Sequence, residues 1–494
     1  MGISETGIKI NLPASKSIVN RALIIEKLSG KRFINKKDIS CDDTKVLSQV
    51  LSLLKSPQIA QINTDNNFLK VDKKIICVNL CNLWTEKSNL WTKINIKNSA
   101  TAMRFMAAFL TQKVGNWLLI GSESMQSRPI DTLVNALRTL GADIEYCGEV
   151  GFLPIKICTK TPLNPQNAEL TIENSNSSQT VSALMLIAPN FDNGLKINVK
   201  NCASFPYILL TKKIMEDCGA EISLKNDLLT VLPCYGTQIT QINMINTDNF
   251  LNKICVNHKK SALSACQIIE SDWSAAAFWY AFLAINEKHT KITLTNLFPD
   301  SYQPDSIVKN IFEKFGIKSV FEENSPRITR INTNLKIQNT INNQQNKIFK
   351  LSKAEIRVNS CNSWTLKQEN FDFDFENYPD LVPIMAVTCC ALDVKFNFSG
   401  VQHLRIKESN RLDALQNELK KCGFLLTQTE NSLQWFGEKC TPEKLPKIET
   451  YNDHRIAMSF AILKQKIDLE IQNPNVVTKS YKNFWKDYKR LTAC

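Results

Sequence analysis

The segment ALRTLGADIEY at residues 136–146 decides the fold, because an amphipathic helix ends there at a glycine and a strand-like segment follows at once. The same pattern recurs as IMEDCGAEISL at 214–224, IFEKFGIKSVF at 311–321 and ELKKCGFLLTQ at 418–428. A glycine directly after a helix supplies the left-handed residue that ends it. Each copy is therefore predicted to be a helix that turns directly into a strand.

Segments with the composition and alternation of half-buried strands surround these copies. They are IKINLP at 8–13, ELTIEN at 169–174, LKINVKN at 195–201, ITLTNLF at 292–298 and VKFNFSGV at 394–401. The alternation of helices and strands predicts an α/β or α+β protein built from repeated units. The copies are unevenly spaced, which predicts insertions near 56–74, 236–262 and 330–350. The last is rich in Asn and Gln and is expected to be a surface loop without a catalytic role.

Length and charge limit the functional classes. A chain of 494 residues exceeds the usual size of one domain, so two domains are expected. The formal net charge of +13 could indicate binding to nucleic acid, to an anionic membrane or to small acidic substrates. An Asn- and Lys-rich composition explains most of this excess as a solvated basic surface. Only Arg and Lys residues that cluster beside other site-like residues therefore point to a function.

Cysteine usage and the absence of long apolar runs predict a cytoplasmic protein without a structural metal. The sequence contains 16 cysteines and 4 histidines but no CxxC pair, so metal-site spacing is missing. A long chain with no secretory leader is expected to keep its thiols reduced inside the cell. No run of about 18 apolar residues is present, so no membrane span is expected.

Several predicted helix starts carry groups that suit an anion, because the N-terminus of a helix attracts negative charge. Small residues there also let a ligand approach the backbone N–H groups. The residues are Lys16, Ser17 and Arg21; Asn98, Ala100 and Arg104; Arg128; Ser177, Ser178 and Gln179; and Ser204 and Tyr207. Each start alone could be an ordinary helix cap with surface charges. Together they favour one highly anionic ligand.

The C-terminal half adds carboxylates and further cations at helix starts. They are Asp380 in NYPDL, Lys407, Glu408 and Arg411 in RIKESNR, Arg455 in YNDHR and Lys479 in VVTKSYKNF. Charges of both signs before buried helices are what general acid–base chemistry on a phosphorylated substrate requires. Each segment alone could equally be a solvated edge or an exposed ion-pair turn. Their combination is what points to catalysis.

In order along the chain, these motifs resemble those of the 5-enolpyruvylshikimate-3-phosphate synthase family. The matching segments are LPASKSIVNRA, NSATAMR, SRPI, SSQ, SFPY, YPD, RIKESNR, YNDHR and TKSYKNF, which together span nearly the whole chain. The resemblance implies a two-domain inside-out (inverse) α/β barrel built from repeated βαβαββ-like units. It further implies that residues 1–20 and 270–494 form one domain and residues 21–269 the other, with the active site in the cleft between them.

The implied reaction transfers the enolpyruvyl group of phosphoenolpyruvate to the 5-hydroxyl of shikimate 3-phosphate and releases phosphate by addition and elimination. It needs no cofactor and no metal. The resemblance implies a monomer that binds these two small molecules and neither nucleic acid nor a membrane. Closure of the two domains around the ligands would exclude water, with a hinge at the two crossovers.

The resemblance also assigns roles by motif position. Asp380 would take the proton of the 5-hydroxyl, and Glu408, assisted by Lys16, would transfer a proton at the methylene carbon. Shikimate 3-phosphate would be bound by Lys16, Ser17, Arg21, Ser177, Ser178, Gln179, Ser204, Tyr207, Asp380 and Lys407. Phosphoenolpyruvate would be bound by Lys16, Asn98, Ala100, Arg104, Arg128, Gln179, Arg411, Arg455 and Lys479.

Two positions depart from the family pattern. Ala100 stands where glycine is common, and Asn410 stands where aspartate is usual. A methyl group at position 100 would crowd a ligand longer than phosphoenolpyruvate. Glyphosate, an inhibitor of the family, is such a ligand, so a relatively glyphosate-tolerant enzyme is expected.

Two alternatives remain open at the level of sequence. One is the related transferase of this fold that acts on UDP-N-acetylglucosamine, which would be favoured by a reactive cysteine in a mobile, electropositive loop. The other is a basic nucleic-acid-binding repeat protein, which would show aromatic residues interleaved with Lys and Arg on an exposed surface. The SSQ and DHR segments argue against the first, and the location of most aromatic residues in apolar runs argues against the second.

Overall fold

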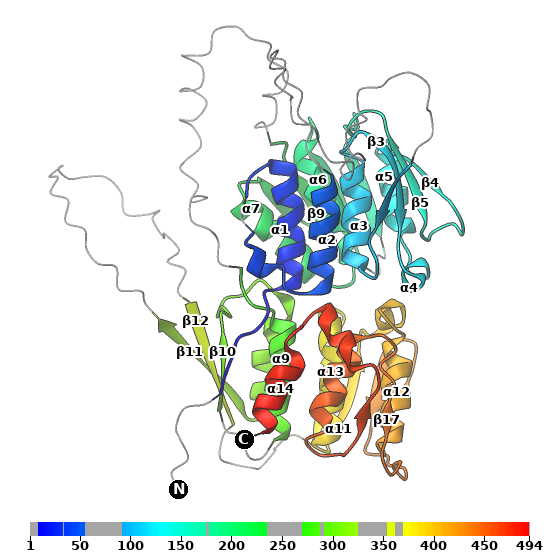
Figure 1. Ribbon diagram of the computed structural model, residues 1–494. Helices are drawn as coiled ribbons and strands as arrows, with labels where there is room; N and C mark the ends of the chain where they lie inside the picture. Colours follow the sequence, from blue (N-terminus) through cyan, green and yellow to red (C-terminus); the bar gives the residue numbers. More distant parts are fainter. Residues whose placement is uncertain are drawn as a thin grey trace, which may run out of the picture.

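The computed structural model of the chain contains two lobes, which lie one above the other in Figure 1. It describes residues 8–32, 34–54, 91–173, 177–234, 269–286, 291–324, 353–360 and 369–493. Each lobe has its own hydrophobic core. The core of the upper lobe runs from Val19 to Ile269, whereas that of the lower lobe combines Ile10 and Leu12 with residues from Trp273 onward. The three predicted insertions lie outside the described residues.

The upper lobe contains the elements from α1 to β9. They are α1 (Lys16–Ser29), η1 (Lys36–Asp38), α2 (Asp42–Leu53), β2 (Thr92–Asn95), α3 (Ala100–Leu110), β3 (Gly115–Ile120), α4 (Glu123–Gln126), α5 (Asp131–Thr139), β4 (Asp143–Tyr146), β5 (Ile155–Thr159), β6 (Glu169–Glu173), α6 (Ser178–Ile187), η2 (Ala188–Asn190), β7 (Leu195–Lys200), α7 (Pro206–Asp217), β8 (Ile222–Lys225) and β9 (Leu228–Val231).

The lower lobe combines the first strand with the elements from α9 onward. They are β1 (Ile8–Ile10), α9 (Trp273–Ile285), β10 (Lys291–Thr295), η4 (Pro304–Ile307), α10 (Val308–Glu313), β11 (Ile317–Asn324), β12 (Lys353–Ser360), β13 (Asn370–Asp374), η5 (Pro379–Leu381), α11 (Val382–Ala391), β14 (Lys395–Ser399), η6 (Gln402–Ile406), α12 (Arg411–Lys421), β15 (Thr427–Gln428), β16 (Ser432–Trp435), β17 (Lys447–Ile448), α13 (His454–Leu463), β18 (Glu470–Ile471), η7 (Pro474–Lys479) and α14 (Phe484–Thr492).

The four-stranded sheets share one plan. Their orders are β2-β3-β5-β4, β6-β7-β9-β8, β1-β10-β12-β11 and β13-β14-β16-β15. In each sheet the first pair is parallel and the other pairs are antiparallel. A parallel pair needs a crossover helix, whereas the last two strands can follow one another directly. The predicted α/β architecture of repeated βαβαββ units is therefore confirmed.

Glycine ends the second helix of each unit, as the repeated segment predicts. The backbone φ is +102° at Gly141, +97° at Gly219, +78° at Gly316 and +98° at Gly423. This left-handed region suits glycine because no Cβ clashes there. The chain then enters β4, β8, β11 and β15, respectively.

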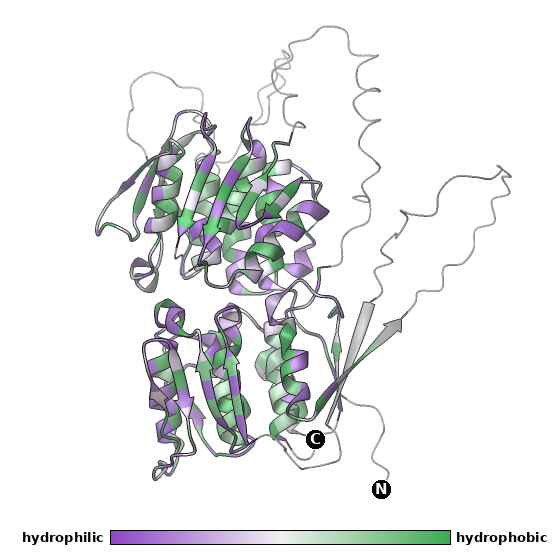
Figure 2. Cartoon of the chain, turned by 180° about the vertical axis from the view of Figure 1, so that it is seen from behind, coloured by the Kyte–Doolittle hydropathy of each residue, from purple (hydrophilic) through white to green (hydrophobic). Residues whose placement is uncertain are grey.

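The first crossover helix of each unit lies inside its lobe. Every residue of α9 is buried, and so is every residue of α3 and α13. A helix that is apolar on all sides must be covered on all sides. Strands such as β6 bury alternate residues only, and Figure 2 shows this alternation of green and purple along the strands. Helices therefore fill the interior and the sheets form the outer wall.

The chain crosses between the lobes twice, and the two crossovers run side by side. Ala14 and Ser271 form an antiparallel bridge, Ser15 N donates to Glu270 O at 2.9 Å, and Asp272 N donates to Pro13 O at 2.9 Å. Such paired segments are suited to act as a hinge. The domain boundaries at 20/21 and 269/270 stay a prediction.

Among the described residues, no helix has the length and apolar character that crossing a membrane would require.

Candidate active site

A pocket of about 80 Å³ lies between the two lobes. Both lobes contribute side chains to it, and most of the residues singled out in the sequence are among them. Its lining consists of Lys16, Ser17, Arg21, Asp43, Ala100, Thr101, Arg128, Ser177, Ser178, Gln179, Ser204, Tyr207, Pro379, Asp380, Lys407, Glu408, Arg411 and His454. The structure thus brings together motifs that are hundreds of residues apart in the sequence.

The upper lobe presents helix N-termini to this pocket. α1 begins at Lys16, α3 follows its cap residue Ser99, and α6 follows Ser177. Ser99 Oγ accepts from Ala102 N at 3.3 Å, and Ser177 Oγ accepts from Gln179 N at 3.3 Å. The converging helix ends add partial positive charge to the upper side of the pocket.

Arg21 is held almost entirely by uncharged groups of the upper lobe. Its Nε donates to Thr211 Oγ1 at 2.6 Å, and its Nη2 donates to Ser182 Oγ and to Tyr207 O at 3.2 Å each. Its Nη1 donates to Ser17 O at 3.0 Å. Burial lowers the pKa of Arg21, yet an arginine keeps its charge in proteins. That charge is fixed in place without being cancelled.

Arg104, the arginine one turn into α3, is held in the same way behind the pocket lining. Its Nη1 donates to Gln179 Oε1 at 3.1 Å, and its Nη2 donates to Pro129 O at 2.7 Å. Gln179 Nε2 in turn donates to Thr101 Oγ1 at 3.1 Å. Burial, followed by repulsion from Arg128, lowers the pKa of Arg104. The pocket-lining amide of Gln179 is therefore oriented by a buried cation.

In the lower lobe the arginines are held by carboxylates. Arg411 Nη1 lies 2.9 Å from Asp380 Oδ1, and Arg455 Nη2 lies 2.8 Å from Asp380 Oδ2. Arg411 Nε lies 2.7 Å from Asp453 Oδ2. Burial alone would raise the pKa of Asp380, but Arg455 and Arg411 hold it below its ordinary range. Asp380 is consequently an ionised carboxylate at neutral pH.

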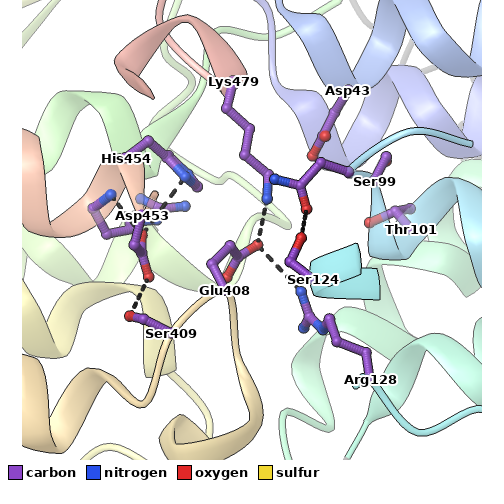
Figure 3. Close-up of polar contacts among 12 residues, drawn as sticks. Asp43, Ser99, Thr101, Ser124, Arg128, Glu408, Ser409, Asp453, His454 and Lys479 are labelled. Atoms are coloured by element: carbon purple, nitrogen blue, oxygen red, sulfur yellow. Dashed lines mark hydrogen bonds and ion pairs between the residues drawn. The ribbon is translucent and has the colours of Figure 1, made fainter. Parts of the chain in front are cut away.

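Glu408 lies at the centre of the cations from both lobes. Figure 3 shows its carboxylate between Lys479 and Arg128. Its Oε1 is 3.2 Å from Lys479 Nζ and 3.5 Å from Arg128 Nη1, and its Oε2 is 3.0 Å from Arg411 Nη2. Burial would raise the pKa of Glu408, but Lys479, Arg128 and Arg411 hold it well below the ordinary value. The pair with Arg128 also joins the lobes.

The two lysines of the pocket differ in their surroundings. Lys16 Nζ lies 3.2 Å from Asp43 Oδ2. Although burial opposes it, Asp43 and then Glu408 raise the pKa of Lys16 above its ordinary range. Lys407 makes no ion pair with any described residue, and burial lowers its pKa to about 8. Lys16 is therefore a permanent cation, whereas Lys407 loses its proton just above neutral pH.

Several buried nitrogens of these cations have no hydrogen-bond partner among the described residues. They are Arg128 Nε and Nη1, Arg455 Nε and Lys479 Nζ. Buried donors are normally paired, and each unpaired one is costly. Arg128 Nη1 and Lys479 Nζ are in ion-pair range of Glu408 Oε1, whereas Arg128 Nε and Arg455 Nε have neither kind of partner among the described residues, so these cations keep donors available for an anionic ligand.

The remaining sequence-nominated residues lie close by. Asn98 does not line the pocket, and its Oδ1 accepts from Ser124 Oγ at 2.9 Å. Ala100 is 6% exposed and lines the pocket at the start of α3. Asn410 is the cap of α12, and its Oδ1 accepts from Asp413 N at 3.4 Å. Asn410 therefore keeps a capping role that aspartate would also fill.

Sequence reasoning assigned no role to Asp43, Thr101 and His454, although all three line the pocket. Asp43 stands in CDDTKVL, where two acidic residues simply open a helix, so nothing in the local pattern distinguishes it. Asp453 and His454 lie inside the YNDHR motif, and Asp453 both caps α13 and holds Arg411. For these two residues the motif itself was an available signal.

Comparisons with known proteins identify the family of the chain. The family model of EPSP synthase (3-phosphoshikimate 1-carboxyvinyltransferase) matches residues 2–241 and 226–488. The 3-phosphoshikimate 1-carboxyvinyltransferase of Bacteroides fragilis (strain YCH46) is 33% identical over 493 residues, which cover 99% of this chain and 96% of the relative. The enzyme of the same name from Buchnera aphidicola subsp. Cinara cedri is 28% identical over 486 residues, covering 97% and 94%.

A solved structure of EPSP synthase from Acinetobacter baumannii shares the fold. It superposes with a TM-score of 0.60 at 17% sequence identity and covers 98% of this chain and 96% of that one. This likeness confirms the predicted inside-out α/β architecture. Because the family model matches nearly the whole chain and the Bacteroides relative exceeds 30% identity over its full length, the chain belongs to the EPSP synthase (3-phosphoshikimate 1-carboxyvinyltransferase) family of shikimate-pathway transferases.

Proposed function

We propose that the pocket between the lobes carries out this family's transfer through Asp380 and Glu408. Asp380 accepts the proton of the 5-hydroxyl of shikimate 3-phosphate while that oxygen bonds to the central carbon of phosphoenolpyruvate. Glu408 delivers a proton to the methylene carbon, which becomes a methyl group. In the second half of the reaction Glu408 takes a proton back from that methyl group and the double bond re-forms. The C–O bond to phosphate breaks, and inorganic phosphate leaves with the proton that Asp380 accepted from the 5-hydroxyl.

The charge state of each carboxylate supports its part. Asp380 is held ionised by Arg411 and Arg455, so it can accept a proton. Glu408 is also ionised, because Lys479, Arg128 and Arg411 surround it. A bound carboxylate and phosphate would draw on the charge of the same cations, which raises the proton affinity of Glu408. Phosphoenolpyruvate would thus bring Glu408 into the state in which it can donate.

We further propose that the substrates divide the pocket between them. Shikimate 3-phosphate binds Lys16, Ser17, Arg21, Ser177, Ser178, Gln179, Ser204, Tyr207, Asp380 and Lys407. Phosphoenolpyruvate binds Lys16, Asn98, Ala100, Arg104, Arg128, Gln179, Arg411, Arg455 and Lys479. The pocket lining, the helix ends and the unpaired donors support this division. Two anionic substrates repel one another, and the cationic surroundings offset that repulsion.

The domain arrangement belongs to the same proposal. Residues 1–20 and 270–494 form one domain, residues 21–269 form the other, and the site lies in the cleft between them. The separate hydrophobic cores and the paired crossovers support two such domains, although α1 begins at Lys16 and Val19 packs in the upper-lobe core, which puts the first crossover a few residues before position 20. We also propose, as the family resemblance implies, that the enzyme works as a cytoplasmic monomer.

The observation that carries the proposal is the convergence of Asp380 and Glu408 with buried cations of both lobes. Phosphate release is measured with shikimate 3-phosphate and phosphoenolpyruvate together and with each omitted. Release is expected only with both, and release with one alone would overturn the assignment. Substituting UDP-N-acetylglucosamine for shikimate 3-phosphate tests the other transferase, and a salt-sensitive gel shift with DNA or RNA tests the nucleic-acid alternative.

A further inference from the structure

Asp305 is a buried carboxyl group behind the pocket to which none of the proposed steps gives a role. It lies on η4 of the lower lobe and is 2% exposed. Its Oδ2 accepts a short hydrogen bond from Ser274 Oγ of α9. Its Oδ1 accepts from Tyr207 Oη of α7 at 3.5 Å. Tyr207 belongs to the upper lobe and lines the pocket, so this carboxyl group is covered by a residue of the opposite lobe.

The charged surroundings of Asp305 favour its neutral form. Asp380 on η5 and Asp272 at the start of α9 repel its ionised form, and Arg455 on α13 is the cation that opposes them. From α7, Tyr207 is held neutral because burial raises its pKa, and Lys213 lies over the Tyr302 ring at 5.3 Å.

α10 supplies no counter-ion either. The ammonium group of Lys309 donates a hydrogen bond to Pro299 O, and the charge of Glu313 contributes to the raised pKa of Tyr280. Burial, followed by Asp380, raises the pKa of Asp305 from the ordinary value of 3.8 to about 7. The arrangement with Tyr207 in place therefore holds Asp305 partly protonated at neutral pH.

We propose that Asp305 takes up a proton from solvent when the lobes close over shikimate 3-phosphate, which makes closure and binding proton-linked. The inference rests on the proposed role of Tyr207 at that ligand. Separation of the lobes removes Tyr207 from Asp305 and exposes the carboxyl group to water, where an aspartate is ionised at neutral pH. Asp380 lies near Asp305 in the same lobe whether or not the lobes are closed. Closure covers Asp305 with Tyr207 and adds the phosphate group of the ligand, and both changes favour the proton-bound form.

Asp305 is thus a positioning residue that acts through Tyr207. The neutral carboxyl group can accept the hydrogen bond from the Tyr207 hydroxyl without placing a second negative charge behind the ligand. By linkage, a group that binds a proton only in the closed state favours that state as pH falls. Between pH 5 and pH 7 this contribution to affinity changes by up to about tenfold per pH unit, and it fades above pH 7.

The test is calorimetric titration of the full-length enzyme with shikimate 3-phosphate at pH 7.0 and 7.5, in buffers of different ionisation enthalpy. At pH 7.0 the wild-type enzyme is expected to take up at least about half a proton more than the Asp305→Asn variant. Protonation of the ligand phosphate contributes equally to both and cancels. The matched control is Asp42→Asn, which alters another contact between the lobes, from Thr478 Oγ1 to Asp42 Oδ2 at 2.6 Å. Its proton count is expected to equal that of the wild type.

Ser274→Ala provides a second, opposite test in case Asp305→Asn does not fold by circular dichroism. The Ser274 hydrogen bond favours the ionised carboxylate, so its loss is expected to increase proton uptake at pH 7.5. Equal proton counts in wild type and Asp305→Asn, or unchanged uptake in Ser274→Ala, would overturn the inference. Absence of any binding heat in the wild type would instead refute the proposed ligand of the pocket.

Discussion

The two lobes hold their buried arginines in opposite ways. In the upper lobe Arg21 and Arg104 are fixed by hydroxyls, an amide and backbone carbonyls. In the lower lobe Arg411 and Arg455 are fixed by carboxylates. Accordingly, the pKa is lowered at Arg21 and Arg104 but raised at Arg411 and Arg455.

This difference indicates a division of labour. A cation held by neutral acceptors keeps its whole charge for a ligand and contributes to binding. A cation paired with a carboxylate also sets the charge state of that carboxylate, which is what proton transfer requires. The upper lobe is therefore suited to binding alone, and the lower lobe is suited to combine binding with proton transfer.

The largest expected effect is the loss of kcat when a carboxylate of the lower lobe is replaced. Asp380→Asn or Glu408→Gln removes a proton acceptor and is expected to lower kcat by about 10²–10⁴-fold. The amides are chosen because alanine at Asp380 would leave Arg411 and Arg455 without that partner. Steady-state phosphate release measures the effect. The control is Asp372→Asn, which alters an exposed carboxylate of β13. Near-normal turnover of either site variant would remove that residue from the proposed mechanism.

The next effect is on stability. Asp453 is 0% exposed and holds Arg411 Nε, so Asp453→Ala leaves a buried guanidinium short of its carboxylate. Its free energy of unfolding is expected to fall by about 3–5 kcal/mol. Thr211→Val removes a neutral acceptor of Arg21, together with the hydrogen bonds of that hydroxyl to Ser182 Oγ and Tyr207 O, and is expected to cost about 1–3 kcal/mol. Urea denaturation measures the free energy of unfolding of both variants. Equal losses would contradict the proposed difference in how the two lobes hold their arginines.

A smaller effect uses Lys407, the exception in the lower lobe because no described carboxylate pairs with it. Its pKa is lowered to about 8 by burial, so the cation is present below that pH and lost above it. KM for shikimate 3-phosphate is expected to rise by up to about tenfold per pH unit above pH 8. Lys407→Arg keeps its positive charge across this pH range, so its KM for shikimate 3-phosphate should stay nearly constant above pH 8. If KM of the variant still rises above pH 8, another titrating group is responsible for the rise.

The smallest effect concerns Ala100 in the upper-lobe pocket wall. Ala100→Gly removes one methyl group, and inhibition by glyphosate is expected to strengthen by up to about tenfold. Turnover without inhibitor should stay close to that of the natural enzyme, because the shorter substrate does not need the extra space. Inhibition curves of the two proteins measure the change. Equal sensitivity would show that the pocket accommodates the methyl group elsewhere.

Local patterns were sufficient for the class of repeated helix–strand units, whereas the two-domain inside-out barrel was implied by the family resemblance. The helix–glycine–strand segments place Gly141, Gly219, Gly316 and Gly423 where the backbone is left-handed. The apolar run WSAAAFWYAFLAI becomes the fully buried α9, because a helix without a polar face has no other stable place. In both cases the physical cause acts within a few residues of the chain.

The site was predictable only in part. Motif order nominated the residues that line the pocket, but local sequence says nothing about which charge meets which. The contact of Lys16 with Asp43 and that of Tyr207 with Asp305 depend on how separate units pack. Aspartates at ordinary helix starts, in CDDTK and YQPDS, carry no signal of that kind.

The split of one βαβαββ unit between β1 and α9 has a consequence for biosynthesis. β1 is synthesised before β10, its partner in the sheet. The pairing of Ile8 with Ile292 therefore cannot form until β10 has been made. The entire upper lobe is translated in between and can fold as a unit during that time. The lower lobe cannot close its first sheet until most of the polypeptide has been made. Synthesis therefore imposes an order on folding in which the upper lobe matures before the lower lobe.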